Sequence, residues 1–196
     1  MTAAAPVTLA GWGVRLEPLS GAHVPALLAA ASDGALWTLH YTSVPGPDAG
    51  SVAAYVDAAL EGQATGTMLP FTVMDQNGDV VGCTRYYDIE PAVPTLAIGY
   101  TWYALRAQRT HVNTACKRQL LGHAFDTLRM RTVYLHTSHE NLRSQVAIER
   151  LGAHRDGVIR RHRRQRDGSL RDTVVYSILD TEWPGIRERL KARLQK

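Results

Sequence analysis

The stretch IGYTWYALRAQRTHVNT, residues 98–114, decides the fold that we expect for this chain. It begins as an apolar strand, passes through a turn that carries Arg106, Gln108 and Arg109, and enters an amphipathic helix. A helix N-terminus exposes unpaired N–H groups and the positive end of the helix dipole, so anions bind there. The stretch therefore predicts a site for a phosphorylated ligand at a strand–helix junction.

Length and composition set the frame around this stretch. The chain has 196 residues, a formal net charge of +4 and two distant cysteines, Cys83 and Cys116. This length predicts a single domain over residues 1–196, with a flexible tail at 1–11 and a C-terminal helix at 183–196. The sequence has no run of about 18 apolar residues, the length that a membrane-spanning helix needs. The two cysteines lack the spacing of a metal site. We expect a cytoplasmic protein with an anionic ligand, no metal and no membrane contact.

Periodicity and turn residues predict a mixed sheet with helices around it. Strands are expected at 14–19, 71–74, 80–87, 95–102, 132–137, 158–164 and 173–179. Helices are expected at 23–31, 51–63, 113–128, 141–151 and 183–194. The long crossover from 102 to 132 implies that strands 95–102 and 132–137 are parallel. The expected fold class is mixed α+β, with a sheet of about seven strands; the family resemblance given next implies three layers and a mostly antiparallel sheet.

This order of elements resembles the GNAT superfamily of acetyl-CoA-dependent N-acetyltransferases, and the segment QRTHVN at 108–113 carries part of the resemblance. The family places a Q/R-x-x-G-x-G/A loop there; Gln108 fits it, whereas His111 and Asn113 stand at the glycine positions. The resemblance implies coenzyme A as the ligand. The residues that it implies as contacts are Trp102, Tyr103, Gln108, Arg109, Thr110, His111, Val112, Asn113, Thr114, Asn141 and Ser144.

A second segment, NLRSQVAIERLGA at 141–153, resembles the family's N-x-x-A/S-x-x-x-Y-E-K-L-G-F helix. Ile148 stands where many members carry a tyrosine that protonates the departing thiolate. In the RimJ/RimL-like branch, a serine at the position of Ser144 meets the thiol instead. A serious alternative is that Ser144 only helps to cap a short helix. The C-terminal segment 166–184 resembles the final hairpin of the same branch.

The implied reaction is the direct attack of a primary amine on a thioester through a tetrahedral intermediate. It needs an acceptor for the amine proton and a donor for the oxyanion. The resemblance places the thioester between strands 95–102 and 132–137. We expect Ser144 to stabilise or protonate the thiolate, whereas Tyr100, His136, Asp88, Glu90, His40 and a water chain all remain candidates for the base. The residues expected on the acceptor side are Trp37, His40 and Tyr41.

The acceptor is expected to be a protein N-terminus, including a ribosomal one, or a small amine, and the enzyme a homodimer. Two alternatives stay open. The chain could keep the fold and bind coenzyme A without catalysis, as a sensor or partner protein, because the loop glycines are missing. It could also use the basic run Arg160–Arg166 to contact nucleic acid. Aromatic residues are not interleaved in that run, which is also typical of an exposed hairpin strand, so nucleic acid is disfavoured.

Overall fold

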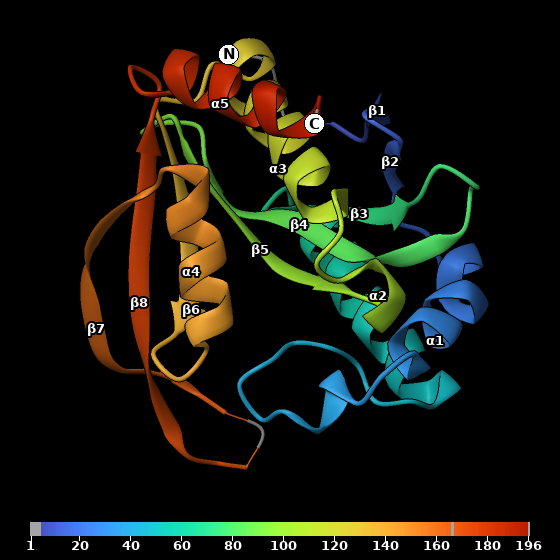
Figure 1. Cartoon of the computed structure of the whole chain (residues 1–196). Helices are drawn as coiled ribbons and strands as arrows, with labels where there is room; N and C mark the ends of the chain where they lie inside the picture. The colour runs from blue at the N-terminus through green and yellow to red at the C-terminus, as the bar shows by residue number, and fades with distance from the viewer. Residues whose placement is uncertain (1–4, 166, 196) are drawn as a thin grey trace.

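The computed structural model, which describes residues 5–165 and 167–195, contains one eight-stranded sheet between layers of helices (Figure 1). The strands are β1 (Leu9–Gly11), β2 (Val14–Pro18), β3 (Met68–Met74), β4 (Val80–Glu90), β5 (Thr95–Tyr103), β6 (Thr132–Ser138), β7 (His154–Arg164) and β8 (Leu170–Leu179). Their order is β1-β2-β3-β4-β5-β6-β8-β7. Only β5 and β6 run parallel, and the other neighbours are antiparallel. The expected fold class is confirmed, with one strand more than the sequence indicated.

Helices cover both faces of the sheet and enclose two apolar cores. The helices are α1 (Val24–Ser32), α2 (Ala49–Ala64), α3 (Val112–Gly122), α4 (Leu142–Leu151) and α5 (Trp183–Leu194). Under α3, α4 and α5 the larger core gathers Tyr86, Leu120 and Ile148, whereas α1 and α2 bury Leu27 and Val56 on the opposite face (Figure 1). Each such side chain contributes roughly 1.5–3 kcal/mol through burial. The sheet is therefore the middle of three layers.

Short-range signals in the sequence predict the local structure well. The side chain of Asn141 accepts a hydrogen bond from the Ser144 N–H at 3.1 Å and caps α4. Gly152 ends the same helix at φ 98°, in the left-handed region that glycine adopts without a steric penalty. Gly78 turns the β3–β4 hairpin at φ 84°. Helix α5 has the bounds 183–194 that the periodicity predicts, and it ends before Gln195, short of the C-terminal helix expected over 183–196.

The prediction of a flexible tail over residues 1–11 is wrong for its last residues, because Leu9–Gly11 forms β1 and pairs with β2. The Gln119 side-chain amide, on α3, donates to the backbone carbonyls of Gly11 and Val14 at 2.9 and 3.1 Å. This contact joins segments more than one hundred residues apart, and no local pattern in the first eleven residues reveals it. Residues 1–4 lie outside the described part of the chain.

Two helices differ from their expected bounds. The helix expected at 113–128 ends its α-helical part at Gly122 and continues as a π-helical turn, His123–Thr127. The helix expected from Ser51 begins at Ala49, because the Asp48 side chain accepts from the Ser51 N–H at 2.9 Å. Asp48 is therefore the N-cap residue of α2.

Candidate active site

A gap opens in the sheet where β5 and β6 separate. Their parallel pairing covers only Thr95–Ala97 of β5 and Thr132–Tyr134 of β6. Beyond these residues β5 continues to pair with β4, and β6 continues to pair with β8 (Figure 1). Among the described residues, the edge of β5 from Ile98 onward therefore has no strand partner on the β6 side. Its polar backbone groups are available to a ligand that lies in the gap.

A β-bulge lies in β5 at the side of this gap. Tyr100 and Thr101 together oppose the single residue Thr84 of β4, because the register shifts there. Tyr100 has φ 51°, which is rare for a bulky side chain and costs roughly 1–2 kcal/mol. Bulges re-aim side chains and are common next to active sites.

The bulge places the Tyr100 ring within a buried aromatic and cationic group. The Arg85 guanidinium lies 4.2 Å from the centroid of the Tyr100 ring and 4.7 Å from that of Tyr55. The Tyr100 and Tyr87 rings meet edge to face, with centroids 5.2 Å apart. Tyr100 is therefore held by packing in the wall of the gap, where a core role and a catalytic role are both open to it.

His136 faces Tyr87 from the other side of the gap. The Tyr87 hydroxyl and the His136 Nδ1 are 2.9 Å apart. Burial lowers the pKa of the half-buried His136 imidazole below its ordinary value, so the neutral form predominates at pH 7. Burial raises the pKa of the Tyr87 phenol, which stays protonated. The tautomer decides which group donates in this contact. In the tautomer with the proton on Nδ1, the Tyr87 oxygen accepts from Nδ1–H and the Nε2 atom of His136 can accept a proton.

The loop before α3 adopts its path without the family's glycines. The residue in the left-handed region is Arg109, at φ 59°. His111 has helical angles, φ −68° and ψ −18°, and Asn113 also has a negative φ. The Asn113 side chain turns toward β5 and accepts from the Tyr103 hydroxyl at 3.3 Å. Positions 111 and 113 therefore make no conformational demand for glycine.

The same loop presents a group of free backbone N–H donors. In residues 5–165 and 167–195, no backbone carbonyl accepts from the N–H groups of Arg109, Thr110, His111, Asn113 and Thr114. The N–H of Val112 donates only to the Thr110 hydroxyl, at 3.3 Å. Free N–H groups at the positive end of a helix dipole fit a pyrophosphate. This observation supports the expected coenzyme A loop.

Ser144 lies in the first turn of α4, which follows β6. Its side chain is half-buried, and its Oγ has no hydrogen-bond partner among the described residues, although its N–H is bonded to Asn141. A capping role would involve the hydroxyl, whereas here the backbone N–H alone takes part. The free hydroxyl is available to a ligand.

The side chains of other residues expected to contact the cofactor instead make contacts within the protein. Trp102 is 4% exposed and its indole N–H donates to the Tyr55 hydroxyl at 3.2 Å, and Tyr103 is 8% exposed. The Gln108 side chain donates to the Tyr103 carbonyl at 3.0 Å and so fixes the loop. The side chains of Trp102 and Tyr103 therefore belong to the core, and their backbone groups are what a ligand in the gap could reach.

The residues expected on the acceptor side lie in the segment between α1 and α2. Trp37 packs against the core beneath these helices. His40 meets Tyr41 edge to face at 5.2 Å, and its Nε2 lies 3.3 Å from a carboxylate oxygen of Glu140. This contact brings the segment to the start of α4 at the open end of the gap (Figure 1).

Sequence reasoning missed Arg85, Tyr87 and Lys117. The Lys117 ammonium donates to the Thr101 hydroxyl at 2.9 Å, and burial lowers its pKa to about 8. Arg85 and Lys117 look like ordinary surface charges in the sequence, and Tyr87 looks like an ordinary strand residue. Only the alternation of β4 indicates that Arg85 and Tyr87 share a face.

Comparisons with known proteins agree with this geometry. Residues 14–154 match the model of the acetyltransferase (GNAT) domain family. A solved structure from T. thermophilus, provisionally assigned as an acetyltransferase, is 36% identical, covers 97% of this chain and 98% of its own, and has a TM-score of 0.86. A GCN5-related N-acetyltransferase from Brucella melitensis is 28% identical, with coverage of 98% and 87% and a TM-score of 0.88. Mycobacterium smegmatis RimJ, solved with CoA-disulfide, is 21% identical, with coverage of 96% and 95% and a TM-score of 0.81, and shows the fold alone. No curated protein sequence matches.

The chain therefore belongs to the GNAT acetyltransferase family, whose members use acetyl-CoA, and it is an acyltransferase. Within the described ranges, no group of three or more His, Cys, Asp or Glu side chains could hold a metal ion. None of the helices described is long and apolar enough to cross a bilayer.

Proposed function

We propose that this enzyme is a RimJ/RimL-like N-acetyltransferase that moves acetyl from acetyl-CoA to a primary amine by direct attack. The observation that carries the proposal is the gap between β5 and β6, which leads to five free N–H groups at the start of α3. A strand edge without a partner can donate to an oxyanion, and free helix N–H groups can hold a pyrophosphate. These two features follow each other along one segment, residues 98–114.

Three side chains at the gap divide the chemistry. His136 is the proton acceptor, because its neutral imidazole is half-buried and hydrogen-bonded through Nδ1. Ser144 stabilises the departing thiolate with its unpaired hydroxyl. Tyr100 shapes the acyl end of the gap, where its ring is fixed by Arg85 and Tyr87. The backbone of residues 109–114 and the Asn141 cap hold the coenzyme A end.

The acceptor class in this proposal is a protein N-terminus, including a ribosomal one, or a small amine. The resemblance of segments 141–153 and 166–184 to the RimJ/RimL-like branch supports this class, and the segment with Trp37, His40 and Tyr41 would border the acceptor. A homodimer in the cytoplasm completes the proposal. Gel filtration with light scattering tests the dimer.

Two experiments test the proposed function. Calorimetry should show that acetyl-CoA binds more tightly than acetyl-pantetheine, which lacks the pyrophosphate that the α3 loop would hold. Thiol release over a panel of peptides and small amines should show turnover. Equal affinity for the two thioesters would contradict the role of the loop. Tight acetyl-CoA binding without turnover on any amine would favour the catalytically inactive alternative.

A further inference from the structure

Two arginines oppose each other beside the turn of the β7–β8 hairpin, one residue pair before the strands end. Arg163 of β7 and Arg171 of β8 are directly paired in the register. Like charges in this position destabilise a sheet. Within the part of the chain that the structure describes, neither guanidinium forms an ion pair or a hydrogen bond. The pair therefore costs folding stability without a compensating contact.

The register places this arginine pair on the same face of the sheet as His136. On β8, Arg171 shares a face with Val175, since alternate residues point the same way. Val175 is the direct partner of His136 on β6. Val174, which precedes Val175, points to the other face of the sheet and belongs to the core under α4. The charges of Arg163 and Arg171 accordingly act on both His136 and Tyr87.

A third guanidinium adds positive charge to the site. Arg85 is 3% exposed, lies between the rings of Tyr55 and Tyr100, and has a buried Nε without a hydrogen-bond partner. The carboxylates whose charges reach the site are Asp88 and Glu140. Asp88 is exposed, and Glu140 is occupied by His40 and Gln165. The acceptor side of the gap is thus cationic and short of counter-charge.

We propose that the acceptor amine carries an anionic group, a carboxylate or a phosphate, which Arg163 and Arg171 bind while the amine lies at His136. This inference rests on the proposed acetyl transfer and names the substrate class of that same site. Guanidinium groups bind both anions through paired, charge-assisted hydrogen bonds. An anion there would also relieve the repulsion between the two arginines. Residues of a functional site often lower the folding stability of the protein, and the repulsion between these two arginines fits that pattern.

The first test compares amines in matched pairs. The carboxylate arm uses amino acids against their amides, and peptides beginning Ser-Asp against Ser-Asn. The phosphate arm uses phosphoethanolamine against ethanolamine. The charged member of at least one arm should have a kcat/KM about 10- to 100-fold higher, as expected for charged hydrogen bonds. Which arm shows the preference identifies the anion.

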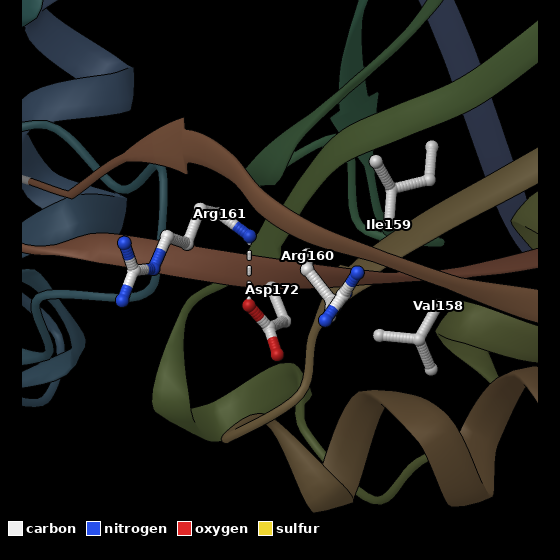
Figure 2. A pocket seen from close by; sticks show the side chains of 5 residues that line it. All are labelled: Val158, Ile159, Arg160, Arg161 and Asp172. Atoms are coloured by element: carbon white, nitrogen blue, oxygen red, sulfur yellow. Dashed lines mark hydrogen bonds between the residues drawn. The ribbon is translucent and has the colours of Figure 1, made fainter.

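Three variants assign the preference to the arginines. Arg163→Gln and Arg171→Gln should abolish the preference for the charged amine, mainly by raising its KM. The control is Arg160→Gln on the same strand, because Arg160 lies with Val158 and Asp172 on the other side of the hairpin (Figure 2). Arg163→Gln and Arg171→Gln should also raise Tm or leave it unchanged, whereas a structural role would make both variants less stable. Equal use of charged and neutral amines, or an unchanged preference in both variants, would overturn the inference.

A binding experiment separates this inference from the proposed function. Inorganic phosphate is titrated into the coenzyme A-saturated protein, so that the α3 loop is occupied. Binding should be lost in R163Q/R171Q and kept in R160Q. If no amine is acetylated but phosphate binds in this way, the proposed function fails and the anion site stands. Absence of phosphate binding at tens of millimolar would refute the anion site itself.

Discussion

The Tyr87 hydroxyl reaches Nδ1 of His136 at 2.9 Å, although β5 lies between their two strands. Gly99 of β5 makes this possible, since a Cβ there would lie 2.7 Å from the Tyr87 ring. Glycine thus lets one side chain pass over the middle strand and bridge the gap. The bridge fixes the imidazole of the proposed base.

His136→Gln should lower kcat by about 10²- to 10⁴-fold, the usual contribution of a general base. In the wild type, the fall of kcat toward acid pH should lie below the ordinary imidazole pKa of about 6.5, because burial lowers the pKa of His136 and only the neutral form accepts a proton. The measurement is the pH profile of kcat from pH 5 to 9, in which the variant lacks this acidic limb. His139→Gln, on an exposed histidine nearby, is the control. An unchanged profile in His136→Gln would assign the base elsewhere.

Gly99→Ala should displace the Tyr87 ring and lower kcat, with acetyl-CoA affinity unchanged. Because the clashing atoms belong to a side chain, the loss of stability should stay near 1–3 kcal/mol, as for other overpacked sites. Steady-state kinetics, calorimetry and urea unfolding measure the three quantities. Gly157→Ala is the matched control, since its new Cβ meets nothing within 4 Å. Wild-type kcat in Gly99→Ala would show that the bridge is dispensable.

Ser144→Ala should lower kcat about 10-fold or more, because the thiolate would lose a hydroxyl that stabilises it. Stability should change by less than about 0.5 kcal/mol, since the Oγ atom has no partner to lose. Kinetics and thermal unfolding measure the two effects, with Ser32→Ala on an exposed serine as the control. The role of Ser144 is disproved by unchanged turnover.

Lys117→Met tests the buried lysine on α3. Its pKa is about 8 in the folded protein and about 10.4 when unfolded, so the folded state releases the proton first. Between pH 8 and about 10.4 the unfolded state therefore binds more protons than the folded state. The contribution of Lys117 to the free energy of unfolding should accordingly rise by up to about 3 kcal/mol as the pH increases from 8 to 10. The measurement is the difference in unfolding free energy between wild type and Lys117→Met as a function of pH. The exposed Lys191→Met should show no such trend; a flat difference for Lys117→Met would contradict the lowered pKa.

Much of the fold could be predicted because its signals are local. The cap at Asn141, the left-handed Gly152 and the hairpin turn at Gly78 depend on residues a few positions apart. Helix α5 has the bounds 183–194 that the periodicity predicts. In contrast, β1 depends on Gln119, and no pattern within residues 1–11 contains that information.

The candidate site likewise has features that local sequence signals predict and features that they do not. The sequence by itself determined the strand–loop–helix segment of residues 98–114, since alternation and helix-starting residues act at short range. It also pointed to Ser144 and His136 as candidates. Only the tertiary structure decided that His111 and Asn113 need no glycine, and that Tyr87 passes over Gly99 to His136. It alone paired Arg163 with Arg171 on the face of that histidine. Strand register and burial set these relationships, because they arise between residues far apart in the chain.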